Sequence, residues 1–204
     1  MESTGRTGYY VRRASHAGKW YSSDSKFLSE TLDGFEQNLL NLDTNPRGII
    51  APHAGFSYSG PTAGYAYNGL RLAIEKLWHG TVVVLHPSHH IYLDGCAVSG
   101  ASLIKTPVGD LEVDDALRSE LLNTGEFSVM DQETDENEHS GEMQYPFIAK
   151  AFRNSRVDVK VLPIMVGQLS NSKENHFGRI LSKFLGRSQI FSVISSDFCH
   201  WGKR

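Results

Sequence analysis

The chain has 204 residues and a formal net charge of -3, from 20 Lys and Arg against 23 Asp and Glu. We expect a single domain over residues 1–204, since this length can bury a core without a disulfide or metal staple. A hydrophobic content of 40% excludes a disordered chain, and the near-balanced charge predicts neither nucleic acid nor anionic lipid as a partner. Two cysteines exclude a disulfide scaffold, whereas histidine is abundant, with nine copies.

No targeting signal is evident in the sequence. The N-terminal segment lacks the apolar region of a secretory signal. The longest wholly apolar run, Val82–Leu85, is far too short to span a membrane. We therefore expect no membrane span and a reducing location, cytoplasmic or nuclear.

Helix and strand patterns alternate along the first part of the chain. A cap within Ser22–Asp24 predicts a helix that ends near Leu40, because apolar residues recur on one face of that segment. The strands are expected at apolar, β-branched runs bounded by Gly, Pro or polar residues. The predicted strands are Gly48–Pro52, Thr81–Leu85 and Cys96–Ser99, and the further predicted helices are Thr62–Leu77 and Asp114–Asn123.

The remaining elements complete an α/β pattern. Asp131–Glu142 carries six acids and no base, which predicts a solvated loop. Pro163 lies inside a predicted strand and indicates an edge strand or a bulge, whereas Ile190–Ser195 is apolar enough for an interior strand covered on both faces. The alternation predicts an α/β fold with a mixed, largely parallel central sheet flanked by helices. The other predicted elements are a helix at His139–Phe152, a strand at Asp158–Val166 and a helix at Ser172–Leu185.

Chemically active side chains follow three of the predicted strands. His53 follows the first, His89 and His90 follow the second, and Ser195 is followed by Asp197, Cys199 and His200 after the last. In open α/β sheets, ligands bind beyond the carboxyl ends of the strands. We therefore expect a shared cleft that contains His53, His89, Asp197 and His200.

Imidazole is the commonest metal ligand near neutral pH, and His53 and His89 are the preferred ligands here. Two imidazoles with one anionic ligand would suit Fe(II), Cu or Zn. His90 is expected to face away from the cleft or to support the ligands, because neighbours on an extended chain point to opposite sides. His200 is the candidate general acid or base and Asp197 its orienting partner. The alternative for Asp197 is a helix N-cap.

The segment Glu138-His139-Ser-Gly-Glu142 places His139 and Glu142 three residues apart, on one face of a helix. They would form a wall of the pocket or support the histidine ligands. The alternative is the capped start of a helix inside an acidic loop. Cys199 is the better placed of the two cysteines for reactivity or metal contact, and a buried inert thiol is the alternative.

The motifs together resemble the Memo family, named as mediator of ErbB2-driven cell motility. The resemblance rests on five segments that occur in the family's order: Ser15–Tyr21, Ile49–Gly55, Pro87–His90, Glu138–Pro146 and Val193–Gly202. The Memo fold is related to the class III extradiol dioxygenases, which are non-haem iron enzymes. The resemblance therefore implies a class III extradiol dioxygenase-like fold.

The resemblance also implies roles for individual residues. His53 and His89 match two metal ligands of the family, and Asp197 and His200 match residues of the same pocket, with His200 in the acid/base position of the dioxygenases. The third ligand would be a cysteine in Memo proteins and a glutamate in the dioxygenases. Neither cysteine of this chain matches it, and His86 stands where the family usually has Gly. The implied cofactor is Fe(II) or Cu, and the implied partners are phosphorylated receptor peptides or cytoskeletal signalling proteins.

Two functions follow as hypotheses. The first is a Memo-like metal-binding protein of redox signalling and cell motility. The second is an Fe(II) extradiol-type dioxygenase acting on catechol-like substrates, and a zinc hydrolase is a weaker third possibility. Family members continue well beyond Arg204, so we expect this chain to lack the family's C-terminal segment, to bind metal weakly and to be less stable and more prone to self-association than a longer form.

Overall fold

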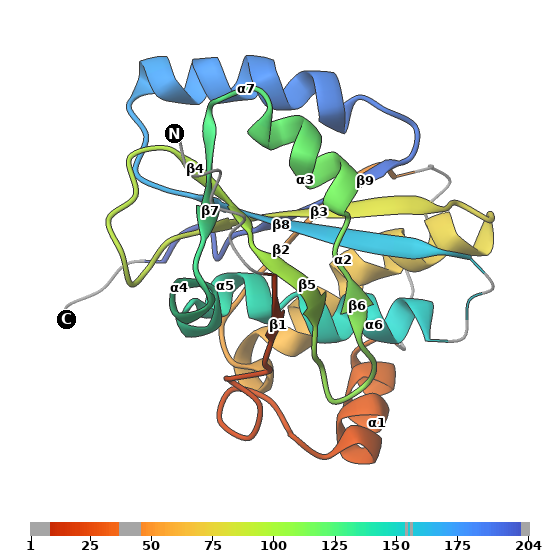
Figure 1. Cartoon of the computed structure of the whole chain (residues 1–204). Coiled ribbons are helices and arrows are strands. Elements are labelled where there is room, and N and C mark those ends of the chain that lie inside the picture. The colour runs from red at the N-terminus through yellow and green to blue at the C-terminus, as the bar shows by residue number, and fades with distance from the viewer. Residues whose placement is uncertain (1–8, 37–45, 154, 156, 201–204) are drawn as a thin grey trace.

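The computed structural model describes residues 9–36, 46–153, 155 and 157–200. Figure 1 shows how its helices and strands are arranged. The strands are β1 (Tyr10–Arg12), β2 (Gly48–Ala51), β3 (Gly80–Pro87), β4 (Cys96–Ser99), β5 (Ala101–Ile104), β6 (Leu111–Glu112), β7 (Phe127–Met130), β8 (Val159–Val166) and β9 (Ile190–Ser195). The helices are α1 (Ser25–Phe35), α2 (Phe56–Glu75), α3 (Asp115–Leu122), α4 (Gln132–Asn137), α5 (His139–Glu142), α6 (Tyr145–Phe152) and α7 (Asn171–Leu185).

The central sheet is mixed and largely parallel, as predicted. Its strand order is β2-β9-β3-β8-β4-β7, and only the β4–β8 pair is antiparallel. Strands β2, β3 and β9 therefore end at the same edge, which brings together the residues that follow them. A second, smaller sheet has the order β1-β5-β6.

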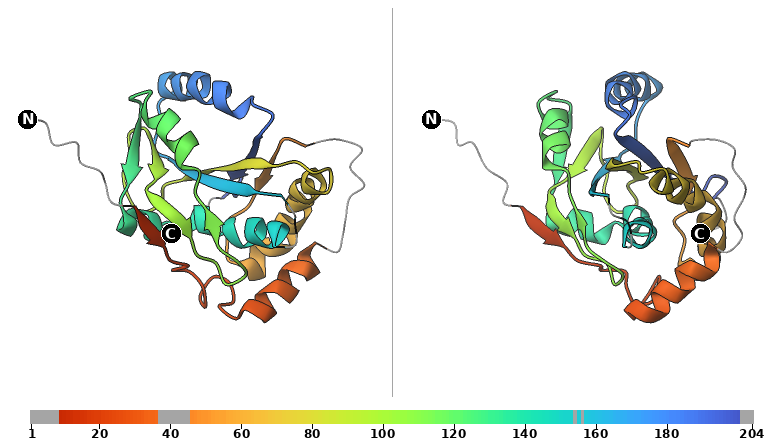
Figure 2. Two further views of the ribbon diagram at one scale, coloured as in Figure 1. Left: turned by 45° about the vertical axis from the view of Figure 1, so that its right-hand side comes forward. Right: turned by 90° about the vertical axis from the view of Figure 1, so that its right-hand side faces the viewer.

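Helices cover both faces of the central sheet (Figure 1). Helices α3 and α7 lie on one face, and α1, α2, α5 and α6 lie on the other, with the small sheet at the flank (Figure 2). The strands bury their apolar side chains between these layers, so that Val82, Val84 and Leu162 are almost fully inaccessible to solvent. No helix among the described residues is both long and apolar enough to cross a membrane.

Strand β9 is interior, as predicted, because it pairs with β2 on one side and β3 on the other. Its cover is incomplete, however. Ile194 pairs with Ile50 of β2 and with Leu85 of β3, and these three side chains share one face of the sheet. Ile194 is 40% exposed and Ile50 is 46% exposed. The expectation that both faces of β9 are buried is thus met on one face only.

Helix α2 begins at Phe56, six residues before its predicted start, and includes Pro61. The early start is stabilised by packing of α2 against α1. Gly60 allows this close approach, because a Cβ atom there would lie 2.3 Å from the Cε2 atom of Phe35. Helix α1 begins after the Asp24 cap, as predicted, and ends at Phe35. The predicted continuation to Leu40 lies outside the described residues.

Strand β8 is not an edge strand, contrary to the prediction from Pro163. It lies between β3 and β4 in the sheet. Pro163 falls between the isolated bridge at Val161 and the β4 ladder, which begins at Ile164. A proline is compatible with this position because it lies outside the ladder with β4.

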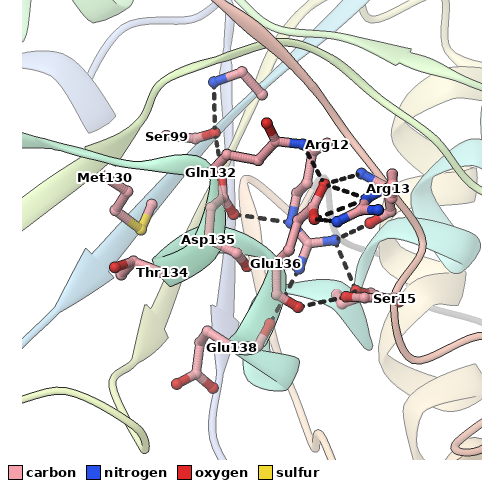
Figure 3. Close-up of polar contacts among 12 residues, drawn as sticks. Arg12, Arg13, Ser15, Ser99, Met130, Gln132, Thr134, Asp135, Glu136 and Glu138 are labelled. Atoms are coloured by element: carbon pink, nitrogen blue, oxygen red, sulfur yellow. Dashed lines mark hydrogen bonds and ion pairs between the residues drawn. The ribbon is translucent and has the colours of Figure 1, made fainter. Parts of the chain in front are cut away.

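The prediction of a solvated loop at Asp131–Glu142 is wrong. This segment forms α4 and α5, and Asp135, Glu136, Glu138 and Glu142 are buried. Burial of a carboxylate requires a compensating partner. Arg12 of β1, itself fully buried, supplies it by donating to Asp135 at 2.8 Å and to Glu142 at 2.7 Å. Figure 3 shows Arg12 and Arg13 facing these acidic helices.

The predicted single helix at His139–Phe152 is interrupted. Helix α5 ends at Glu142 and α6 begins at Tyr145, with Pro146 in its first turn. Proline favours the first turn of a helix because the N–H groups there lack intrahelical partners. The break turns α5 into a short element that presents His139 separately from α6.

Candidate metal centre

A cleft of about 580 Å³ lies beyond the carboxyl ends of β2, β3 and β9. Six of the residues singled out in the sequence line it: His53, His89, His139, Asp197, Cys199 and His200. The predicted meeting of three strand ends thus contains a fourth contribution, His139 from the start of α5. His90 lines a different, smaller hollow next to Asp131, and Glu142 is buried behind the cleft.

Three imidazoles converge in this cleft. His53, His89 and His139 each offer a nitrogen that lies within 4.8 Å of those of the other two. Their ring centroids are 5.3 Å apart for His53 and His89, 4.5 Å for His89 and His139, and 5.7 Å for His53 and His139. Side chains at this spacing can bind one metal ion together.

The His53 ring is oriented by Ser195. The hydroxyl of Ser195 donates to the carbonyl oxygen of Ser140 at 2.8 Å and receives the Gln144 side-chain amide at 3.0 Å. Because its proton is committed to Ser140, Ser195 accepts from Nδ1 of His53, at 2.8 Å. This hydrogen bond assigns the proton of His53 to Nδ1 and leaves the Nε2 lone pair available to a metal.

Glu138 orients the other two imidazoles. Its Oε1 atom accepts from Nδ1 of His89 at 2.8 Å and lies 3.5 Å from Nδ1 of His139. The carboxylate is held by the backbone N–H of His89 at 2.6 Å and by the N–H and hydroxyl of Ser140 at 2.9 and 2.8 Å. A carboxylate behind a histidine fixes its tautomer and raises its basicity as a ligand.

The protonation states suit metal binding. Burial raises the pKa of Glu138, but the hydrogen bonds from His89 and Ser140 outweigh it and lower this pKa to about 2. Burial lowers the pKa of His139 to about 4, with repulsion from His89 and His53 acting in the same direction and Glu138 opposing. Burial also lowers the pKa of His53. At neutral pH the cleft therefore contains an ionised carboxylate and neutral imidazoles, which is the form that binds metals.

Asp197 contacts His53 through both carboxylate oxygens. Oδ1 accepts from the backbone N–H of His53 at 2.7 Å, and Oδ2 lies 3.5 Å from Nε2 of the same residue. Asp197 therefore positions the loop after β2, and no helix follows it within the described residues. The expected orienting contact between Asp197 and His200 is not among the hydrogen bonds of the described part of the chain. His200 lines the cleft without it.

The two cysteines differ in their surroundings. Cys199 is exposed and lines the cleft, whereas Cys96 is buried in β4, where burial raises the pKa of its thiol to about 11. His86 is also buried, and its Nδ1 atom lies 3.1 Å from both the Pro87 carbonyl and the Ser140 hydroxyl. His86 thus packs behind Ser140 rather than joining the three imidazoles.

Several supporting residues were missed in the sequence. Ser195 and Arg12 carry no local signal, since their partners lie far away in the chain. Trp20 lines the cleft and stacks on His139, with ring centroids 4.4 Å apart. Glu138 was visible as the residue before His139, and its burial would have been the signal for its role.

Replacing Glu138 by glutamine should weaken metal binding about 10- to 100-fold, the usual cost of losing such a supporting carboxylate. The neutral amide no longer polarises the imidazoles of His89 and His139. Glu136→Gln is the matched control, because Glu136 is equally buried but pairs with Arg13 instead. Competition titration with a chromophoric chelator measures both affinities, and equal losses in the two variants would contradict the role of Glu138.

Known proteins resemble this chain closely. The sequence model of the family described as Memo-like protein matches residues 12–204. Protein MEMO1 of Xenopus laevis is 45% identical over 193 residues, which are 95% of this chain and 64% of that protein. Protein MEMO1 of Homo sapiens is 42% identical over the same shares. Protein memo-1 homolog of Caenorhabditis elegans is 41% identical over 198 residues, which are 97% of this chain and 55% of that protein.

This chain thus spans less than two thirds of the length of these curated relatives. The match nevertheless covers almost all of the chain and includes every residue of the cleft. The protein belongs to the Memo family.

Proposed function

We propose that this protein is a metal-binding signalling protein of the Memo type, with iron or copper bound at His53 and His89. One observation carries the proposal: two imidazoles from separate strand ends converge, and each has its Nδ1 atom held by an oxygen, of Ser195 and of Glu138. Such anchoring is typical of histidines that bind a metal through the other nitrogen.

The residues around the metal would have distinct tasks. His53 and His89 bind the ion, and Asp197 fixes the loop that carries His53. His200, at the rim of the cleft, serves as acid or base toward a bound molecule. A bound iron or copper ion would supply redox chemistry and a polarising charge. Cys199 lines the same cleft and provides a thiol within reach of that chemistry.

The alternative is an Fe(II) dioxygenase of the extradiol type acting on catechol-like substrates. The size of the cleft and the presence of His200 are compatible with it. Non-haem Fe(II) oxygenases use two histidines and one carboxylate. In the described part of the chain the group of convergent ligand atoms consists of histidines alone. The donor set therefore favours the first proposal.

We place the protein in the cytoplasm or nucleus, acting in receptor-driven cell motility. The partners in this proposal are phosphorylated receptor peptides or cytoskeletal signalling proteins. The support is membership of the Memo family, whose matched relatives carry the same sequence over the whole cleft. The Cys199 thiol, being exposed beside the imidazoles, gives the proposal a redox-sensitive group.

Substituting His53 by alanine should lower the affinity for Cu²⁺ or Fe²⁺ by about 100-fold or more, because the site loses one of its preorganised ligands. Metal content after purification, and titration against a competing chelator, measure the effect. His79→Ala is the control, since His79 is exposed and lies before β3, at the opposite end of that strand from His89. Equal affinity in the wild type and both variants would refute the proposed site.

A further inference from the structure

His139 is placed differently from the other residues that line the cleft. It begins α5, a helix that does not belong to the sheet edge. Yet its nitrogen joins those of His53 and His89 within 4.8 Å, whereas Asp197, Cys199 and His200 stay outside this group. The resemblance gives two ligands in this sequence, and the structure adds a third imidazole beside them.

The spacing of the rings fits a shared ion. With metal–nitrogen distances of about 2 Å, imidazoles at bond angles of about 90° to 110° have ring centroids about 4.5 to 5.2 Å apart. The His89–His139 pair is at 4.5 Å and the His53–His89 pair at 5.3 Å. The His53–His139 pair, at 5.7 Å, needs only a small rotation of one ring.

The His139 ring is fixed from two sides. Glu138 lies 3.5 Å from its Nδ1 atom, which leaves Nε2 as the nitrogen available for a ligand. On its other side Trp20 stacks on the ring at an angle of 31°. Trp20 is itself tied to α2, because its carbonyl oxygen accepts from the backbone N–H of Phe56 at 2.9 Å. A ring held in this way needs little further ordering when a metal binds.

The position of Glu138 depends on Arg12. The Nη2 atom of Arg12 donates to the Glu138 carbonyl oxygen at 3.1 Å and to that of Asp135 at 2.8 Å. The buried arginine thereby holds the junction between α4 and α5, from which both Glu138 and His139 project. The third imidazole is built into the fold through these contacts.

We propose that His139 is the third protein ligand, so that the described part of this chain forms a complete three-imidazole site. The inference deepens the proposed function and rests on it. Three neutral nitrogen donors leave the charge of the ion uncompensated and favour Cu²⁺ or Zn²⁺ over Ca²⁺, Mg²⁺ or Mn²⁺. The affinity expected for this chain is that of a three-ligand site with positions left for solvent.

The test compares Cu²⁺ binding to the 204-residue chain and to its variants. His139→Ala should weaken binding about 10- to 100-fold, since a ligand should matter at least as much as a residue that supports one. The electron paramagnetic resonance spectrum of bound Cu²⁺ should change from a pattern of three coordinated nitrogens to one of two. His90→Ala is the matched control: its ring lies 6.1 Å from that of His139, but it lines another hollow. It should leave both readouts unchanged.

A second variant keeps the test informative if His139→Ala folds poorly. His139→Cys returns a ligand atom to the same position, and it should restore binding and add a thiolate-to-copper absorption band. Unchanged affinity and an unchanged nitrogen pattern in His139→Ala, with loss of binding in His53→Ala, would overturn this inference and leave the proposed function standing. Unchanged binding in both variants would overturn the two together.

Discussion

Arg12→Met is expected to destabilise the protein by about 3 to 5 kcal/mol, the cost of removing one partner from a buried ion pair. Arg12 is fully buried and donates to the carboxylates of Asp135 and Glu142. Methionine keeps the volume of the aliphatic part of the side chain but leaves both acids without their cation. The free energy of unfolding from urea titration, followed by circular dichroism, measures the loss.

Arg187→Met provides the matched control. Arg187 pairs with Glu120 at 2.7 Å, but both side chains are substantially exposed, at 34% and 49%. An ion pair in such a position contributes about 0 to 1 kcal/mol. A similar small loss for Arg12→Met would mean that Asp135 and Glu142 are stabilised without their arginine, which would contradict the network drawn in Figure 3.

Local patterns predicted most of the sheet and the side of the cleft that the sheet provides. Strands β2, β3, β4 and β9 carry apolar, β-branched runs, and these runs specify a strand whatever surrounds them. His53 and His89 follow such strands directly. Their place at one sheet edge follows from the parallel arrangement alone.

The acidic segment could not be predicted in the same way. Six acids without a base indicate solvent exposure when only the segment is considered. The partner that buries them, Arg12, is 123 positions from Asp135 and 130 from Glu142. Only the folded chain shows that the two regions meet. The position of His139 depends on that meeting, so its approach to the other imidazoles was equally hidden.

The cleft therefore combines two kinds of construction. The sheet delivers His53 and His89 from its strand ends, with apolar packing behind them. The buried ion network delivers Glu138 and His139 from α4 and α5, with Arg12 at its centre. A change that weakens the network should disturb the metal site even when the sheet remains intact. Stability and metal affinity are accordingly expected to fall together in Arg12→Met.

Acid should weaken the fold through the same network, with an effect on the order of 3 kcal/mol from Glu142 alone. Burial raises the pKa of Glu142, but hydrogen bonds and attraction from His16 and Arg12 outweigh it and lower this pKa from 4.5 to about 2. The unfolded chain therefore binds a proton at higher pH than the folded protein does. The stabilisation from Glu142 is fully present above pH 4.5 and is lost as the pH falls from 4.5 toward 2.

Urea titrations at intervals between neutral pH and pH 3 would show this loss as a falling free energy of unfolding. Glu142→Gln should be less stable at neutral pH and should flatten the curve below pH 4.5, because the amide cannot titrate. Glu133→Gln is the control on the same segment, since Glu133 is exposed, and it should keep the slope of the wild type. If Glu142→Gln and the wild type lost stability in parallel as the pH fell, the acid sensitivity would have to originate elsewhere in the protein.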